Sequence, residues 1–272
     1  MGVSCEGAVA IPIKAPLEVE SMARAGVTLD RVLGAVQALV TPGVTTGQIA
    51  DAVEDALSQV RATSLLKGFS QRPNGAVFPA SACVSVNEEV THGLPGKRLL
   101  HAGDCVKLDI ALRFEGWCVD AARTIVLPGG DMRGLRLVSA AREAMQAALS
   151  AVRPGVRWST IAQDVEKIVA QRECHLVAGY VGHGVGKELH EAPRVCFARG
   201  DFTKITDDFT LFPGMTLCIE PVVGEGSSPF MTNLMPDGWT VVSNDRRWSA
   251  HEEATIAVTR TGCRILAGRP GA

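Results

Sequence analysis

Two acidic residues near the middle of the chain have a spacing that suits a shared cation. Asp109 and Asp120 are separated by ten residues, and the stretch between them has a turn signal at Glu115 and Gly116. Such a stretch favours a β-hairpin, which would place the two carboxylates side by side. Two close carboxylates repel each other unless a proton or a cation lies between them.

A second pair of acids repeats this pattern. Gly214–Glu220 is an apolar run ending in a carboxylate, like Gly103–Asp109 at an offset of 111 residues, and Glu253 precedes the strand-like run 255–258. The alternative is that these are solvated acids at strand ends. With His183 from a glycine-rich segment, four carboxylates and an imidazole are the donors that two hard or borderline divalent ions need. Two ions roughly 3.5–4 Å apart would activate a water molecule and polarise a carbonyl.

The elements that must position these residues also occur twice. A helical pattern over 17–40 ends at Thr41-Pro42-Gly43, and Thr45 with Gln48 forms a capping box for the next helix. The segment 40–44 recurs as 152–156, preceded by a helical pattern over 134–152. This self-similarity predicts a duplicated half-domain with pseudo-two-fold symmetry.

Composition narrows the class of protein. The chain has 272 residues, 27 Lys and Arg against 29 Asp and Glu, and 46% hydrophobic residues. This is typical of a globular protein, and neither a nucleic-acid partner nor a membrane is expected. None of the eight cysteines forms a C-x-x-C pair, so we expect reduced thiols in a cytoplasmic protein. Residues 1–14 read as a loose leader, and nothing suggests an obligate dimer, so we expect a monomer.

Five stretches in order resemble the type I methionine aminopeptidases, members of the pita-bread creatinase/prolidase superfamily (peptidase family M24). They are Pro79–Pro95, Asp109 with Asp120, Gly182–Pro193, Pro213–Pro221 and Met235–Val241. The resemblance extends from about Ile13 to Ala267. It implies an α+β pita-bread fold, in which a central antiparallel sheet is covered by helices. The single domain would span residues 15–268, with half-repeats at 15–130 and 131–268.

The resemblance also implies a role for each matching residue. The metal ligands would be Asp109, Asp120, His183, Glu220 and Glu253, holding two divalent ions (Co, Mn, Fe or Zn). Glu220 would also act as general base, His190 would bind the scissile carbonyl, and His92 would contact the scissile amide. Phe78, Cys83 and Trp239 would line the pocket for the N-terminal side chain.

Six positions near these residues depart from the family pattern. Lys107 replaces an Asn, Ala111 a Thr, Val119 a Gly, Leu189 a pocket Phe and Ala254 a His, while Gly75 stands where a Tyr is common. Lys107 would either compete with a metal for the carboxylates or direct its ammonium elsewhere. Such changes around ligands lower metal affinity or activity by roughly 10–100-fold. His101, His175 and His251 match nothing and are assigned to the surface or the core.

Three functions follow from this reading. The first is a metal-dependent aminopeptidase that removes the initiator methionine from nascent proteins, by attack of a water or hydroxide bridging two metal ions. The second is a specialised paralogue with the same chemistry, acting on another N-terminal residue or amide or conferring inhibitor resistance. The third is a catalytically dead binding module on the same fold. In such a protein we would expect some of the metal ligands to be replaced. All five ligands are present.

Overall fold

The computed structural model describes residues 10–70, 75–130, 132–226 and 229–269. Of the expected leader, residues 1–9 lie outside this part. In the first half, the described elements are α1 (Pro16–Gln37), α2 (Thr46–Gln59), β1 (Thr63–Ser64), β2 (Cys83–Val86), β3 (Glu89–Thr91), β4 (Cys105–Phe114) and β5 (Trp117–Val126). In the second half they are α3 (Met132–Ala151), α4 (Trp158–Gln171), β6 (Cys174–Leu176), β7 (Gly182–Gly184), β8 (Glu191–Val195), β9 (Thr216–Ile219), β10 (Val222–Glu225), β11 (Thr232–Leu234), β12 (Val241–Ser243), β13 (Ser249–His251), β14 (Ala254–Val258) and β15 (Cys263–Ala267), with short 3-10 turns at Arg199–Asp201 and Ile205–Asp207.

The helices begin where local signals place them. Pro16 stands at the first position of α1, where its missing N–H is not needed, and the Glu18 carboxylate accepts the Ala15 N–H at 2.9 Å. At α2, the Thr45 hydroxyl accepts the Gln48 N–H at 3.2 Å, and the Gln48 side chain accepts the Thr45 N–H at 2.9 Å. The predicted capping box is therefore confirmed.

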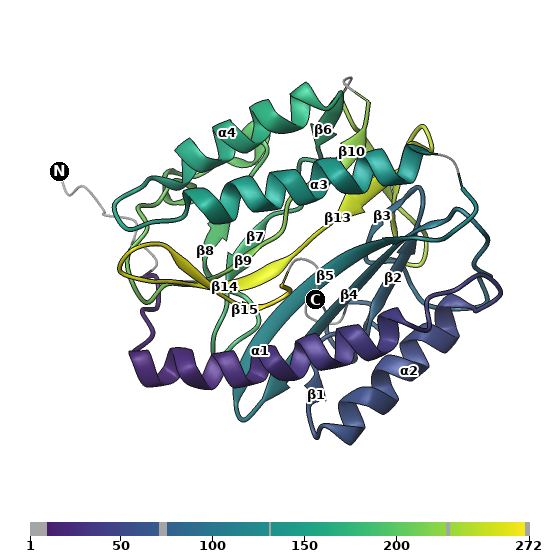
Figure 1. The fold of residues 1–272 in the computed structure, drawn as a ribbon, viewed down its shortest axis with the longest axis horizontal. Helices are drawn as coiled ribbons and strands as arrows, with labels where there is room; N and C mark the ends of the chain where they lie inside the picture. Colours follow the sequence, from purple (N-terminus) through teal and green to yellow (C-terminus); the bar gives the residue numbers. More distant parts are fainter. Residues whose placement is uncertain (1–9, 71–74, 131, 227–228, 270–272) are drawn as a thin grey trace.

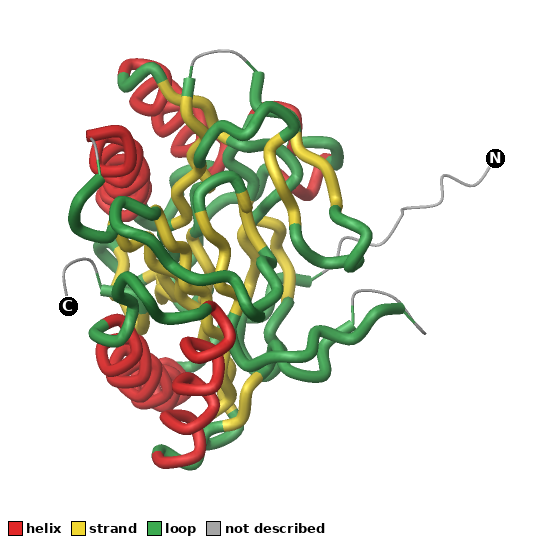
Figure 2. The backbone as a smooth tube through the Cα atoms, turned by 90° about the vertical axis from the view of Figure 1, so that its right-hand side faces the viewer, coloured by secondary structure: helices red, strands yellow, loops and turns green. Residues whose placement is uncertain are grey.

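Two helix pairs enclose the strands (Figure 1). The pair α1 and α2 lies along one side and the pair α3 and α4 along the other, with the strands between them. In the view turned by 90°, strands fill the middle of the molecule and loops cover much of the near side (Figure 2). Each helix pair covers its own apolar core: Met22, Leu29 and Val53 belong to one, and Leu137 and Trp158 to the other. This arrangement agrees with the expected α+β architecture.

All strand pairings in the described residues are antiparallel. The strands form groups ordered β1-β4-β2 with β5 beside β4, β15-β14-β9-β7-β8, β13-β10-β6 and β11-β12-β3. The β4–β5 hairpin turns at Glu115 and Gly116, whose φ angles of 50° and 78° lie in the left-handed region. The predicted hairpin and its turn are therefore confirmed.

One detail of the strand prediction is wrong. Asp109 does not end an apolar strand, because β4 continues past it to Phe114. Its neighbours in the ladder are Cys83 on β2 and Ala122 on β5, and this pairing on both sides keeps the backbone extended. Glu220, in contrast, directly follows β9 as expected.

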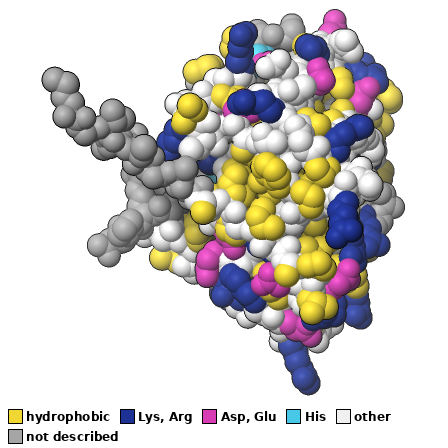
Figure 3. All heavy atoms as spheres, turned by 90° about the vertical axis from the view of Figure 1, so that its left-hand side faces the viewer, with side chains coloured by type: hydrophobic (Ala, Val, Ile, Leu, Met, Phe, Trp, Pro, Cys, Tyr) yellow, Lys and Arg dark blue, Asp and Glu magenta, His cyan; other side chains and the backbone are white. Residues whose placement is uncertain are grey.

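The surface carries charges of both signs. On the face in Figure 3, Lys, Arg, Asp and Glu side chains surround a group of hydrophobic side chains. The seven cysteines of the described residues carry free thiols and all but Cys263 are buried, while Cys5 lies outside that part. None of the helices within the described ranges combines the length and hydrophobicity that a membrane span requires.

Candidate metal centre and substrate pocket

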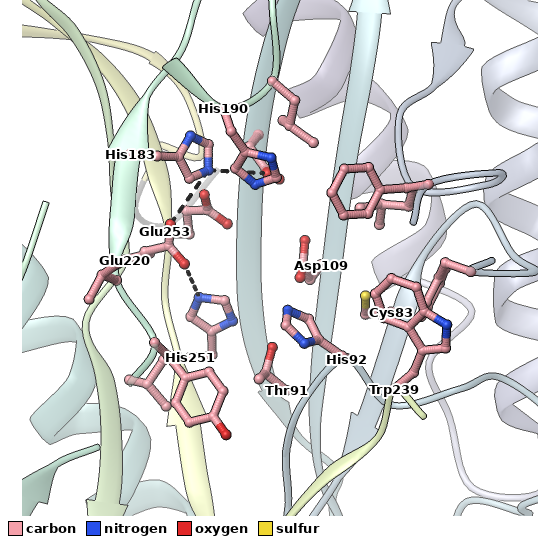
Figure 4. A pocket seen from close by; sticks show the side chains of 18 of the residues that line it. Cys83, Thr91, His92, Asp109, His183, His190, Glu220, Trp239, His251 and Glu253 are labelled. Atoms are coloured by element: carbon pink, nitrogen blue, oxygen red, sulfur yellow. Dashed lines mark ion pairs between the residues drawn. The ribbon is translucent and has the colours of Figure 1, made fainter. Parts of the chain in front are cut away.

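The five predicted metal ligands line one cavity of about 380 Å³ (Figure 4). Asp109 and Asp120 come from β4 and β5, and His183 comes from the middle of β7. Glu220 follows β9, and Glu253 immediately precedes β14. Strands from both halves of the chain therefore deliver acids to the same point.

The donor atoms of these residues lie close enough together to share ions. Oxygens of Asp109, Asp120 and Glu253 lie within 4.8 Å of one another. The His183 Nε2 atom lies 3.7 Å from the Glu220 Oε1 atom and 4.0 Å from the Asp120 Oδ2 atom. The structure thus brings all five residues together as the sequence predicted, although their roles remain a prediction.

Contacts between the halves fix the acids. The Thr255 hydroxyl accepts the Asp120 N–H at 2.9 Å and donates to the Asp120 carbonyl at 2.8 Å. The Glu253 N–H donates to the Ala122 carbonyl at 2.9 Å. Because these bonds join β14 to β5, the two strands hold Asp120 and Glu253 beside each other.

The glycines around His183 allow close packing of the backbone. A methyl group on Gly182 would overlap the Cys218 carbonyl, and one on Gly184 would overlap the Ala192 carbonyl. His183 is therefore held tightly between neighbouring strands. Its Nδ1 atom lies 2.9 Å from the Gly184 carbonyl oxygen. That bond assigns the proton to Nδ1 and leaves Nε2 with a free lone pair facing the acids.

Burial perturbs every titratable group of the site. Desolvation, which disfavours the charged form, raises the pKa of Asp109 to about 7. Desolvation and mutual repulsion also raise the pKa values of Asp120, Glu220 and Glu253 well above the usual range. Burial lowers the pKa of His183 to about 4, so its imidazole is neutral at pH 7.

Unpartnered buried atoms test whether these residues suit a cation. Asp120 Oδ1, Glu220 Oε1 and Glu253 Oε1 are buried and accept no hydrogen bond from any described residue. Leaving such acceptors unsatisfied is costly. Divalent ions would satisfy them and remove the repulsion between the carboxylates, so the donor set fits a metal centre.

An apolar pocket adjoins the acids. Phe78, Cys83 and Trp239 form one buried cluster, with Phe78 and Trp239 packed edge to face at 5.2 Å between ring centroids. Cys83 pairs with Asp109 across the β2–β4 ladder, so the pocket begins next to the predicted metal ligands. These three residues therefore lie together, as the resemblance implied.

His92 and His190 line the same cavity. The His190 ring lies 4.4 Å from the His183 ring and 5.5 Å from that of Phe69, measured between centroids. His92 has a φ of 54°, a left-handed conformation that costs on the order of 1–3 kcal/mol in a non-glycine residue. Burial lowers the pKa values of both imidazoles, that of His92 to about 4.

The sequence reading missed several residues of the cavity wall. Leu66, Phe69, Thr91 and Tyr180 line it, and none of them belongs to the predicted site. His251, assigned to the surface or the core, is buried with its Nε2 atom 3.7 Å from Glu220 Oε2. Only its position two residues before Glu253 could have singled it out.

The positions that depart from the family pattern differ in their distance from the site. Leu189 lines the cavity, whereas Ala111, Val119 and Ala254 are buried in the strands. The Lys107 ammonium donates to the Asn87 carbonyl at 2.7 Å and is absent from the cavity wall. Of the two possibilities for Lys107, the structure therefore shows the ammonium directed away from the carboxylates. Gly75 does not line the cavity either.

The chain is similar in sequence and in structure to known metallopeptidases. The model of metallopeptidase family M24 matches residues 20–260. The methionine aminopeptidase of Escherichia coli K12 is 36% identical over 94% of both chains, and methionine aminopeptidase 1 of Bacillus subtilis is 35% identical over 93% of this chain and 97% of its own length. The crystal structure of methionine aminopeptidase from Thermotoga maritima has a TM-score of 0.86 and 35% identity, covering 96% of this chain and all of the other.

More distant neighbours share the fold. The prolidase from Pyrococcus horikoshii superimposes with a TM-score of 0.69 at 22% identity, covering 95% of this chain and 64% of the prolidase. The expected pita-bread architecture and the resemblance to methionine aminopeptidases are thereby confirmed. The chain belongs to metallopeptidase family M24 and is a metal-dependent hydrolase.

Proposed function

We propose that this protein is an aminopeptidase that removes the N-terminal methionine from peptides and nascent proteins. One observation carries the proposal: the five ligating residues and the apolar cluster of Phe78, Cys83 and Trp239 line the same cavity. A peptide bond at the acids would place the preceding side chain in the apolar pocket. The names of the relatives support methionine as that side chain.

The cofactor in this proposal is a pair of divalent ions, cobalt, manganese, iron or zinc. Asp109, Asp120 and Glu253 would hold one ion, and His183 and Glu220 would complete the site of the other with Asp120 and Glu253. When bound, such ions polarise a carbonyl and lower the pKa of a water molecule. Carboxylate and imidazole donors accept several metals, so cellular supply selects among them.

The residues of the chain itself position the substrate and move the proton. His190 is exposed at the cavity and burial lowers the pKa of its imidazole, so its neutral ring could donate an N–H to the oxygen of the scissile carbonyl as negative charge develops there. Glu220 would take the proton from the attacking water. His92, on the opposite wall (Figure 4), would contact the scissile amide and assist the leaving amine.

The apolar pocket suits a thioether side chain. Trp239 and Phe78 present aromatic rings, and contacts between sulfur and aromatic rings contribute about 0.3–1.5 kcal/mol each. Leu66, Phe69 and Leu189 extend the apolar wall. A flexible, polarisable methionine side chain would adapt to this mixed lining.

Domain organisation and location complete the proposal. We place a single catalytic domain at residues 15–268, with half-repeats at 15–130 and 131–268, after a leader at 1–14. Since the substrates are nascent chains, we place the protein in the cytoplasm, and we propose a monomer.

A substrate panel tests this proposal. The metal-free protein, reloaded in turn with Co²⁺, Mn²⁺, Fe²⁺ or Zn²⁺, is given peptides X-Ala-Ser in which X varies. We expect hydrolysis to be fastest with methionine and to be lost in Glu253→Gln, but not in the exposed control His101→Ala. A panel in which methionine ranks low would indicate the specialised paralogue. Absence of turnover with every ion would overturn the proposal.

A further inference from the structure

His251 is a buried imidazole with no role in the proposed reaction. It is the last residue of β13, and its side chain is 4% exposed. Its Nε2 atom has no hydrogen-bond partner among the described residues. Figure 4 shows the ring directed at Glu220 from the side opposite His183. A buried nitrogen without a partner loses its hydration without compensation, so packing alone does not explain it.

Glu220 lies between two imidazoles. Its Oε1 atom is 3.7 Å from the Nε2 atom of His183, and its Oε2 atom is 3.7 Å from the Nε2 atom of His251. Donor atoms of Glu220, His251 and Glu253 also lie within 4.8 Å of one another. Donors on one tetrahedral ion at 2.0–2.2 Å are roughly 3.4 Å apart, so the two imidazoles are equally well placed for ligation.

The backbone of His251 is held rigidly. Its N–H donates to the Thr124 hydroxyl at 2.8 Å, and its carbonyl accepts from the same hydroxyl at 2.7 Å. The residue also pairs with Val222 in the β10–β13 ladder. A side chain on such a clamped strand end has a defined direction, as a metal ligand requires.

We propose that His251 is an additional metal ligand, so that the centre uses one imidazole on each side of Glu220. The inference rests on the proposed dinuclear centre but adds a sixth ligating residue to it. The alternative role is a hydrogen bond from the imidazole to Glu220, which would make His251 a positioning residue.

Glutamine distinguishes the two roles, because it keeps an N–H donor but is a much poorer ligand than imidazole. Calorimetric titration of the metal-free protein with Co²⁺ or Mn²⁺ measures affinity without reference to turnover. We expect His251→Gln and His251→Ala to weaken binding of one ion by about tenfold or more. His175→Gln, on β6 of the same group of strands, should bind as the unmodified protein does.

X-ray absorption of the cobalt-loaded, unmodified protein gives a second readout that needs no variant. Two imidazoles per dinuclear centre support the proposal, and one imidazole overturns it even if the variants fail to fold. Unchanged affinity in His251→Gln, with peptide hydrolysis intact, would overturn this inference alone. A protein that binds no divalent ion would overturn the proposed function as well.

Discussion

An ion pair beside the segment that carries His190 is predicted to fix the position of that segment. Lys14 and Glu191 form a salt bridge whose side chains are 6% and 12% exposed. Glu191 also accepts the N–H groups of Lys187 at 2.8 Å and Glu188 at 3.2 Å. Lys14 therefore connects the start of the described chain to the segment between β7 and β8. Replacing Lys14 with methionine would keep the apolar stem and remove the charge.

The size of the effect follows from burial. Removing one partner of a buried pair costs about 3–5 kcal/mol, because the other charge is left uncompensated. Glu191 would retain its two backbone hydrogen bonds, so we expect the lower end, about 3 kcal/mol, or roughly 100-fold in an opening equilibrium. Glu188 offers a matched control on the same segment. It forms an ion pair with Arg113 at 3.2 Å, but its side chain is 73% exposed, so loss of this pair leaves no buried charge. Glu188→Gln should cost at most about 1 kcal/mol.

Two measurements check this prediction. Urea denaturation gives the free energy of unfolding, and hydrogen exchange reports opening of the segment 185–191. In Lys14→Met, amides there should exchange up to roughly 100-fold faster, and kcat should fall because His190 loses its fixed position. If Lys14→Met matches Glu188→Gln within 0.5 kcal/mol (about the error of such comparisons), the reasoning from burial is refuted.

Other predictions concern the site itself. His190→Ala should lower kcat by roughly 10²–10³-fold with unchanged metal content by elemental analysis, and loss of bound metal would contradict the role given to it. A chelator should abolish hydrolysis, and added divalent ions should restore it. Because burial raises the pKa of Asp109 to about 7, protons compete with metal below that pH. Affinity should therefore fall as the pH drops from 8 to 6 (about one unit either side of that pKa), with proton release in calorimetry; a flat profile would contradict this. Trp239→Ala should reduce kcat/KM for a methionine peptide more than for an alanine peptide, and an equal reduction would argue against its place in the pocket.

Several elements of the fold could be predicted from the sequence because they depend on interactions between residues that are close together in the chain. The hairpin follows from the turn residues Glu115 and Gly116, and the start of α2 follows from Thr45 and Gln48. Such signals act within a few residues, so they persist whatever the rest of the chain does. The end of β4 was misjudged because pairing with β2 and β5, and not the local pattern, decides where that strand stops.

The predicted ligands were found through spacing and resemblance, and the structure brings them together. Phe69 and His251 were missed because the main signal for each is proximity in three dimensions. Phe69 lies beside His190 although the two are far apart in the sequence, and His251 on β13 faces Glu220, which follows β9. Neither belongs to a motif that sequence reasoning could use.

The sequence by itself determined the residue types and the carboxylate and imidazole donors expected for a metal centre, and it predicted duplicated halves. Composition, repeats and short spacings can be read from the linear sequence alone. Only the tertiary structure decided which side chains share the cavity. It turned the Lys107 ammonium towards Asn87, buried Lys14 against Glu191 across 177 residues, and pointed His251 at Glu220. These outcomes depend on how the two halves pack and on which polar groups lose water, and both are set only when distant segments meet.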